Sequence, residues 1–304
     1  MISLNKYHSI NGEYVSNSLI QELTESELSD NLSKNLLRDG YVLMRNIYKK
    51  NDIQNARETI LKKLYKVGEL KEPYQNGIFS GISKRREFYP TTFDLGKFWQ
   101  EISESDELRK VIHGKEIIKV FEKIFEQKVD HFSFAWLRSI IKGKASPLHL
   151  DHPYMNRGTD KLLTCWTPLD HINKNEGTLF ILKNSHKWND IKENFLNHDI
   201  DLNPEVPGHI LENTFDLVKR KKSCFLTSSF DEGDCLIFGM FTVHGSFDNN
   251  TTTVKIRLSC DTRFQPHSEP MDHRFSGRNP VAHKGLGYAC LSSSVPLTEN
   301  LKNK

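Results

Sequence analysis

The sequence predicts a mainly β protein with helices packed at its front. Between Asp130 and Phe264 short apolar runs alternate with turn residues, which is typical of a sandwich or barrel. Before Asp130, apolar residues recur at helical spacing. No Gly/Ser-rich or Pro-rich linker separates the two parts, so we expect one domain spanning residues 1–304.

Residues 1–129 are expected to form a mostly helical front with one strand. Thr24 and Glu27 have the spacing of a capping box, and Asn51 is expected to cap a later helix. Gly114 is expected to interrupt the third helical stretch. The expected elements are a helix through the leucines at 28, 32 and 36, a strand at 41–45, a helix at 51–68 and a helical stretch at 105–127.

Residues 130–265 are expected to form the β core. Its segment 190–222 is polar and contains Pro204 and Pro207, which indicates an inserted loop with helical pieces. Residues 266–304 are rich in Pro and Gly and are expected to form a coil tail. The expected strands lie within 132–141, 162–169, 178–182, 223–226, 235–238, 242–246 and 253–264.

Composition restricts the possible partners and compartment. Basic and acidic residues nearly balance at a net charge of +3, and the basic residues are scattered, so we expect no nucleic-acid partner. No apolar run approaches the roughly 20 residues that span a bilayer, so no membrane association is expected. Five cysteines without a C-x-x-C pair favour a reducing, cytoplasmic location. A small molecule is then the expected partner.

Three residues have the types and order of a metal site. His149 and Asp151 are two positions apart, so in a strand both side chains point to the same side. This pair alone is weak evidence, but His244 follows a Gly-Asp turn and an apolar strand later in the chain. In an antiparallel sandwich these three residues converge at one end. Two imidazoles and one carboxylate on one face favour a non-haem iron centre over zinc.

A strand after Val254 adds a candidate anion site. Lys255, Arg257 and Ser259 alternate on one side of this strand. A guanidinium group inside a barrel needs an anion, and its planar fork fits the far carboxylate of a 2-oxoacid whose near end chelates the metal. Ser246, two residues after His244, would add a hydroxyl group. Taken alone, Arg257 is better interpreted as a surface strand residue paired with Asp or Glu.

A set of short motifs runs along the chain in a fixed order: Asp39–Arg45, His149-Leu-Asp151, Trp166–Asp170, Glu176–Thr178, Ser185–Lys187, Gly233-Asp234 and His244–Ser246. With these motifs in this order, the sequence resembles the phytanoyl-CoA dioxygenase-like (PhyH) family of Fe(II)/2-oxoglutarate-dependent oxygenases. The resemblance implies a double-stranded β-helix, the jelly-roll core of cupin-like proteins. It also implies His149, Asp151 and His244 as iron ligands, and Trp166, Ser246 and a strand arginine as 2-oxoglutarate contacts.

One position departs from the family pattern. The family's arginine lies about eleven residues after the distal histidine, and Lys255 occupies that position here. Arg257 is two residues further on, behind a turn at 249–253 that looks lengthened. We expect Arg257 to anchor 2-oxoglutarate and to share a face with Lys255, which is the alternative anchor. Thr164, two residues before Trp166, is expected in the same pocket.

The resemblance implies a hydroxylase that uses Fe(II), 2-oxoglutarate and O2 and releases succinate and CO2 while oxidising a C–H bond. Related halogenases lack the carboxylate ligand, so the presence of Asp151 argues for hydroxylation, desaturation or ring closure instead. Two other classes stay open. A zinc hydrolase could use the same three residues around a bound water, and a non-catalytic jelly-roll module could keep them without activity.

Four arginines are candidates for binding an anionic group on the substrate. Arg138 and Arg263 lie on strands that lead to the same end of the core, and Arg85 and Arg86 belong to a basic run in the front third. The pocket lid is expected to come from residues 70–100, from 190–220 and from the tail. Phytanoyl-CoA itself is not implied as the substrate.

Overall fold

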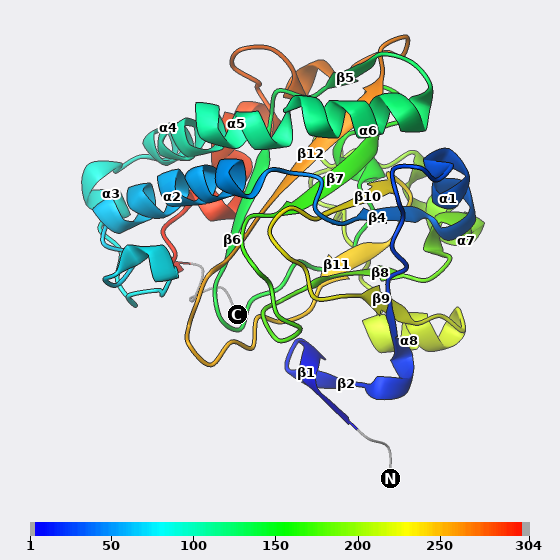
Figure 1. Cartoon of the computed structure of the whole chain (residues 1–304), viewed down its shortest axis with the longest axis horizontal. Coiled ribbons are helices and arrows are strands. Elements are labelled where there is room, and N and C mark those ends of the chain that lie inside the picture. Colours follow the sequence, from blue (N-terminus) through cyan, green and yellow to red (C-terminus); the bar gives the residue numbers. More distant parts are fainter. Residues whose placement is uncertain (1–3, 300–304) are drawn as a thin grey trace.

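The computed structural model describes residues 4–299 and contains two main sheets flanked by helices (Figure 1). The larger sheet has the order β4 (Tyr41–Met44), β10 (Cys235–Gly239), β7 (Leu163–Pro168), β12 (Arg257–Pro266) and β5 (Val129–His131), and β6 (Trp136–Ile140) also pairs with β12. The smaller sheet has the order β11 (His244–Ser246), β8 (Leu179–Leu182), β9 (Phe225–Thr227) and β3 (Ile20–Glu22). All pairs in these two sheets are antiparallel except β3 with β9.

Seven of these strands, β6 to β12, match the seven runs predicted between residues 132 and 264. The two sheets pack against each other through a buried cluster drawn from β4, β7 and β10 on one side and β8 and β9 on the other. Trp166, Phe238 and Ile181 are representative members. A mainly β architecture with helices is therefore confirmed.

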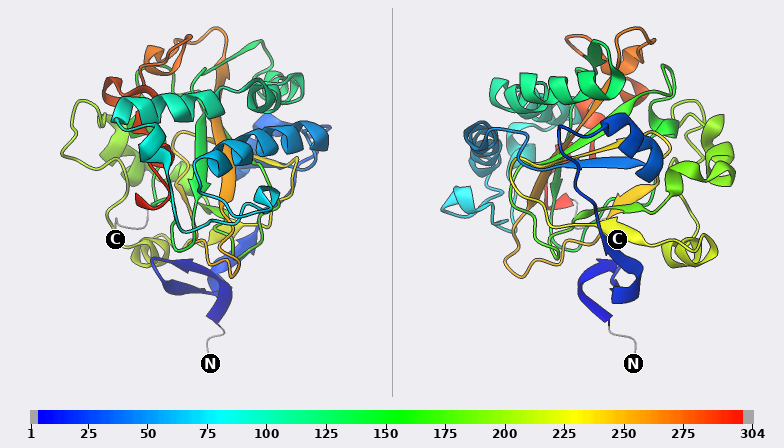
Figure 2. Two further views of the ribbon diagram at one scale, coloured as in Figure 1. Left: turned by 90° about the vertical axis from the view of Figure 1, so that its left-hand side faces the viewer. Right: turned by 45° about the vertical axis from the view of Figure 1, so that its right-hand side comes forward.

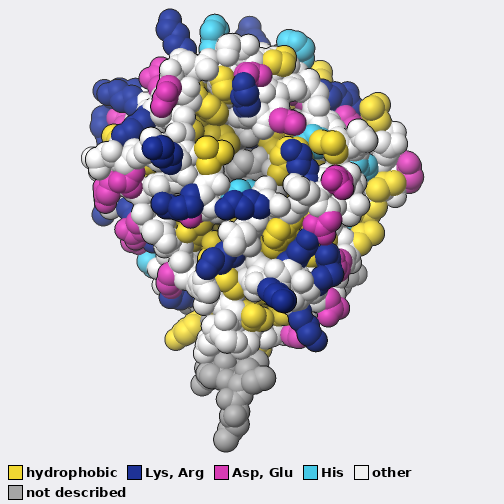
Figure 3. Space-filling view, turned by 90° about the vertical axis from the view of Figure 1, so that its right-hand side faces the viewer, with side chains coloured by type: hydrophobic (Ala, Val, Ile, Leu, Met, Phe, Trp, Pro, Cys, Tyr) yellow, Lys and Arg dark blue, Asp and Glu magenta, His cyan; other side chains and the backbone are white. Residues whose placement is uncertain are grey.

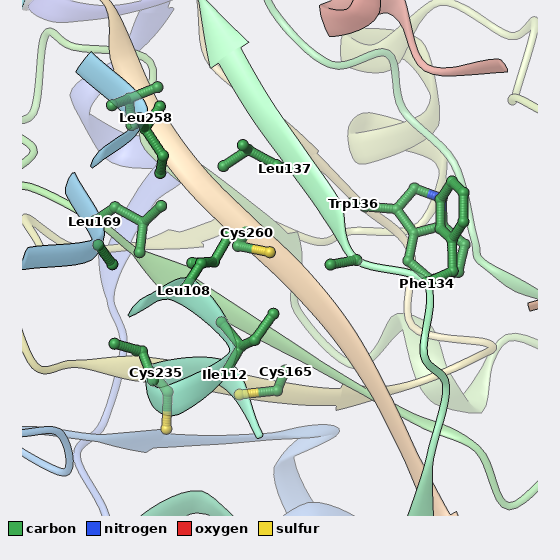
Figure 4. Close-up of a cluster of buried hydrophobic side chains, with 14 of the residues drawn as sticks. Leu108, Ile112, Phe134, Trp136, Leu137, Cys165, Leu169, Cys235, Leu258 and Cys260 are labelled. Atoms are coloured by element: carbon green, nitrogen blue, oxygen red, sulfur yellow. The ribbon is translucent and has the colours of Figure 1, made fainter. Parts of the chain in front are cut away.

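Successive residues of β12 point to opposite faces of the larger sheet. Leu258, Cys260 and Phe264 belong to the main hydrophobic core, together with residues of the helices. Figure 4 shows Leu258 and Cys260 beside Leu108 and Ile112 of the helix α5 (Asp106–Ile112). The intervening residues of β12 point between the sheets, and they are polar or charged.

Helices cover the outer face of the larger sheet (Figures 1 and 2). They are α2 (Lys50–Lys66), α4 (Thr92–Ser103), α5 and α6 (Lys115–Phe125). The break predicted at Gly114 is confirmed, because Gly114 is the N-cap of α6. The inserted segment contains α7 (Asn189–Leu196) and α8 (Thr214–Arg220), as predicted for a loop with helical pieces.

Two predicted helix starts are wrong. α1 (Leu32–Asp39) is capped by Asn31, whose side chain accepts a hydrogen bond from the Lys34 N–H, so the capping box predicted at Thr24 does not form. α2 begins at Lys50, and Asn51 lies inside it. The chain turns earlier than predicted because Asn46 adopts a positive φ of 55°, and its N–H donates to the buried carboxylate of Asp234.

The prediction of one strand in residues 1–129 is also wrong. The hairpin β1 (Leu4–Ile10) and β2 (Glu13–Ser16) and the strand β3 precede α1, and β5 closes this region at Val129–His131. The hairpin extends from the body of the molecule in Figure 2. Its turn is held by Asp248, which accepts hydrogen bonds from the Ser9 hydroxyl and the N–H groups of Asn11 and Gly12. Such a long-range contact leaves no local pattern in the sequence.

The prediction also missed the short helix α3 (Arg85–Phe88) and the capped helix α4. In α4, Thr91 and Asp94 form the capping box. Beyond Pro266 the tail contains 3-10 turns within the described residues, consistent with the predicted coil.

None of the helices in residues 4–299 is long and apolar enough to cross a membrane. In Figure 3, Lys and Arg are spread over the face shown, with Asp and Glu among them.

Candidate active site

His149, Asp151 and His244 meet between the two sheets. The backbones of His149 and His244 exchange two hydrogen bonds of 2.9 Å, which sets their rings 4.2 Å apart between centroids. Oδ1 of Asp151 lies 3.7 Å from Nε2 of His149 and 3.9 Å from Nε2 of His244. The predicted strand is limited to two isolated bridges at His149, one to His209 and one to His244, because Asp151 is already the N-cap of the 3-10 turn His152–Tyr154.

Each histidine is oriented through its other ring nitrogen. Nδ1 of His149 lies 2.8 Å from the carbonyl oxygen of Pro147, and Nδ1 of His244 lies 2.9 Å from that of Thr242. A carbonyl can only accept, so these contacts place the proton on Nδ1 and leave the Nε2 lone pairs facing Asp151. Burial lowers the pKa of His149 to about 3 and also lowers the pKa of His244. Both imidazoles are therefore neutral at pH 7, as metal binding requires.

Asp151 is held through one oxygen and presents the other to the histidines. Oδ2 accepts hydrogen bonds from the Thr164 hydroxyl at 2.5 Å and from Nη2 of Arg263 at 3.1 Å. Burial alone would raise the pKa of the Asp151 carboxyl, but Arg263 and the two histidines hold it well below its usual range. The carboxylate is therefore ionised, with Oδ1 directed to the same space as the two Nε2 atoms.

These three side chains fit a divalent transition metal. Their ligand atoms all lie within 4.8 Å of one another, and all three residues are buried. In residues 4–299 this is the one cluster of three or more His, Cys, Asp or Glu side chains with that geometry. Two neutral imidazoles and one carboxylate occupy three positions of an octahedral ion and leave three positions for other ligands.

A cavity beside the triad contains the guanidinium group of Arg257. The cavity is also lined by Trp166, Leu179, Ser246 and Asp261. Nη1 of Arg257 donates to the Ser259 hydroxyl at 2.7 Å, and its guanidinium carbon lies 5.9 Å from the centre of the Trp166 ring. Burial lowers the pKa of Arg257 to about 10, so the group stays charged at pH 7. Arg257 forms no ion pair with a described residue, so an anion bound in this cavity would supply its counter-charge.

Lys255 lies on the outside of this cavity. Its Nζ is 2.9 Å from Oδ2 of Asp170 and donates to the carbonyl of His171. The prediction that Lys255 and Arg257 share a face is wrong, because Val254 adopts a positive φ of 53° and regular strand geometry begins only at Arg257. This position also contradicts Lys255 as the alternative anchor.

The other predicted pocket residues are close to the triad. The Ser246 hydroxyl accepts a hydrogen bond from the Ser146 N–H at 2.7 Å, and Trp166 forms one wall of the Arg257 cavity. Thr164 does not line that cavity as predicted. Its hydroxyl group donates to Asp151 instead, because the short segment after His149 brings the carboxylate over β7.

Two of the four candidate substrate arginines reach the site. Arg138 and Arg263 line a second cavity of about 120 Å³ next to His149 and Asp151. Arg85 does not, since it is fully buried against Glu69 and donates to the carbonyls of residues 293–295. Arg86 pairs with Glu299 at the surface. The prediction that Arg85 and Arg86 bind substrate is therefore wrong, because both guanidinium groups tie α3 to the tail.

Sequence reasoning missed three residues of the second cavity and its surroundings. Tyr154 packs edge-on to His149 at 5.9 Å between ring centroids, and Trp136 lies under the Arg263 guanidinium group at 4.5 Å. Asp261 pairs with Arg138 at 2.6 Å. Asp261 continues the alternation of Arg257 and Ser259, so the strand pattern could have identified it. Tyr154 and Trp136 carry no comparable signal.

The family model described as phytanoyl-CoA dioxygenase (PhyH) matches residues 36–257, and the protein belongs to this family. Among curated proteins, it is similar to the peroxisomal phytanoyl-CoA dioxygenases of Homo sapiens, with 25% identity over 228 residues, and of Bos taurus, with 24% identity over 234 residues. Each match covers 73% of this chain and 64% of the relative, so the chain spans less than two thirds of these proteins.

Solved structures share the fold. The non-heme alpha ketoglutarate dependent carbocyclase SnoK from nogalamycin biosynthesis superposes with a TM-score of 0.54 at 15% identity, covering 91% of this chain and 96% of SnoK. EvdO2 from Micromonospora carbonacea var. aurantiaca, solved in complex with 2-oxoglutarate, gives a TM-score of 0.52 at 14% identity, covering 85% of this chain and all of EvdO2 (100%). At these identities the likeness extends to the fold alone.

Proposed function

We propose that this protein is an Fe(II)- and 2-oxoglutarate-dependent oxygenase with a double-stranded β-helix core. It oxidises a C–H bond of a small molecule, most simply by hydroxylation, and releases succinate and CO2. The observation that carries the proposal is the convergence of Nε2 of His149, Nε2 of His244 and Oδ1 of Asp151 beside the buried Arg257, which forms no ion pair with a described residue. Membership of the PhyH family and the likeness to EvdO2, solved with 2-oxoglutarate, support it.

Separate sets of residues would bind the metal and the cosubstrate. His149, Asp151 and His244 would hold Fe(II), and Arg257 would bind the distal carboxylate of 2-oxoglutarate, with Trp166 and Ser246 as further walls of that cavity. When bound, iron with 2-oxoglutarate and O2 supplies the oxidant for the C–H bond. The protein contributes orientation: the carbonyls of Pro147 and Thr242 fix the two rings, and Thr164 with Arg263 fixes the carboxylate.

The Arg257 cavity distinguishes this function from a zinc hydrolase on the same three residues. A hydrolase needs a metal-bound water and a substrate but no buried cation for a second carboxylate. A non-catalytic module would have no need for three preoriented ligand atoms. A buried guanidinium group without an acidic partner is costly to keep, and the bound cosubstrate would provide the missing anion. We also propose that the protein is cytoplasmic and forms a single domain.

Anaerobic addition of Fe(II) and 2-oxoglutarate tests the function. The chelate should produce a visible charge-transfer band, and admission of O2 should release succinate in an amount that depends on iron. Zn(II) in place of Fe(II) should give neither result. A wild-type protein that shows no band, or a band that is unchanged in Asp151→Ala, would contradict the proposal.

A further inference from the structure

The second cavity beside the triad contains the guanidinium group of Arg138, which has no role in the proposed binding of metal or cosubstrate. Its walls are Trp136, Pro147, Tyr154 and Met155, and its charged residues are Arg138, Arg263 and Asp151. It borders the Arg257 cavity, since Arg138, Ser146 and His149 line both. A ligand in the second cavity would therefore lie directly beside the metal ligands.

Arg138 is prepared to bind an anion. Its Nε donates to Oδ2 of Asp261 at 2.6 Å, and this ion pair fixes the plane of the guanidinium group. Neither Nη1 nor Nη2 donates to a described protein atom at hydrogen-bonding distance, and 26% of the side chain remains exposed. Two parallel N–H groups at the end of a fixed guanidinium group match the two oxygens of a carboxylate.

Arg263 adds a second positive charge to the same cavity. Its Nη2 donates to Asp151, but Nε and Nη1 are buried without a hydrogen-bond partner among the described residues. The guanidinium carbon lies 4.5 Å from the centre of the Trp136 ring, and this contact helps to hold the group in place. A buried donor left without a partner costs free energy, which an anionic ligand nearby would recover.

The charges of the two cavities do not balance. Three arginines, Arg138, Arg257 and Arg263, face two carboxylates, those of Asp151 and Asp261. Fe(II) and doubly charged 2-oxoglutarate cancel each other. One positive charge therefore remains whether or not these two are bound.

We propose that the substrate carries one carboxylate, which Arg138 binds in the second cavity while Arg263 contributes charge. The apolar walls formed by Trp136, Pro147 and Met155 fit an apolar segment next to that carboxylate. The substrate class is thus a small monocarboxylic acid with an apolar body. This inference rests on the proposed function and narrows it to a substrate type.

The test uses the full-length protein loaded anaerobically with Fe(II) and 2-oxoglutarate. Butanoate, hexanoate, octanoate, benzoate and phenylacetate are titrated against their primary amides, which match them in shape but carry no charge. Binding is measured from the change in the visible band. At least one acid should saturate the signal with a Kd at least tenfold below that of its amide.

Arg138→Met should remove the preference for that acid over its amide, with both measured at saturating 2-oxoglutarate, because Arg138 and its partner Asp261 also line the Arg257 cavity. Lys255→Met, which removes a cation outside both cavities, is the matched control and should keep the preference. Arg138→Lys retains the charge and the partner for Asp261 but has no planar fork, so it should weaken acid binding at least threefold. If Arg138→Met does not fold, Arg138→Lys alone tests whether Arg138 binds the substrate carboxylate.

Three results would overturn the inference. Amides could bind as tightly as acids, no acid could bind at all, or Arg138→Met could keep the preference for the acid. Failure of the proposed function is distinguishable, because wild type would then show no band with Fe(II) and 2-oxoglutarate before any acid is added.

Discussion

The two faces of β12 differ in what they contribute to the molecule. Leu258, Cys260 and Phe264 pack against the helices in the main core, whereas Arg257, Ser259, Asp261 and Arg263 point between the sheets. The pleat of one strand separates the two sets, so stability and chemistry depend on different side chains only one residue apart. The following changes test this division, from the largest expected effect to the smallest.

Asp151→Ala should have the largest effect on the site face. It removes the one carboxylate among the three proposed ligands, so Fe(II)-dependent succinate formation should fall by about a thousandfold or more. Activity and iron content are the measurements, and circular dichroism checks the fold. Asp231→Ala, at an exposed aspartate, should retain both iron and activity. Full activity in Asp151→Ala would contradict the proposal that these three residues bind the catalytic metal.

Leu258→Ala should have a large effect on the core face only. The side chain is 1% exposed, and its removal should lower the free energy of unfolding by about 2–5 kcal/mol. Chemical denaturation measures this loss. The Kd of 2-oxoglutarate, measured well below the unfolding transition, should stay within twofold of wild type. A comparable loss of cosubstrate binding would show that the two faces are coupled.

Arg257→Ala should have the converse effect to Leu258→Ala, although the two residues are adjacent. It should weaken cosubstrate binding. Loss of the buried guanidinium group should raise the Kd of 2-oxoglutarate by about 100-fold, since truncating one member of a buried charge pair costs about 2–5 kcal/mol. Lys255→Ala should change this Kd by less than threefold, because Lys255 pairs with Asp170 outside the cavity. If only the lysine variant lost affinity, the assignment of the anchor would be reversed.

Thr164→Val should have a moderate effect on the metal. Valine keeps the shape of threonine but removes the hydroxyl donor to Oδ2 of Asp151. We expect about tenfold weaker metal binding, the lower end of what loss of an outer-shell partner causes. Competition with a chelator measures it. Thr262→Val, at a buried threonine of β12 whose hydroxyl has no described partner, is the matched control.

The smallest effect is expected for His8→Leu, because His8 lies on β1 and belongs to neither face of β12. His8 packs on Phe247, and its pKa is lowered to about 4, mainly by burial. The unfolded chain binds a proton near pH 6.5, so stability is lost as the pH falls from about 6.5 towards 4. His8→Leu should reduce the loss between pH 7 and pH 4 by about 1 kcal/mol. An unchanged pH profile of unfolding would contradict this assignment.

The sequence was sufficient to predict what depends on strand order and alternation. His149, Asp151 and His244 could be placed together because the order of motifs and the pattern of short strands determine which residues converge. The choice between Arg257 and Lys255 could not be settled, since it depends on the backbone of Val254. Arg85 could not be separated from Arg138, because burial against Glu69 is a tertiary property. The β1–β2 hairpin was missed because its turn is held by Asp248, which lies 236 positions after Gly12 in the sequence.

The most direct test of the account is a crystal structure of the protein grown without O2 in the presence of Fe(II) and 2-oxoglutarate. We predict one metal ion bound by Nε2 of His149, Oδ1 of Asp151 and Nε2 of His244, with the distal carboxylate of 2-oxoglutarate on Arg257. A metal ion bound elsewhere, or 2-oxoglutarate seated against Lys255 or outside the Arg257 cavity, would contradict the account.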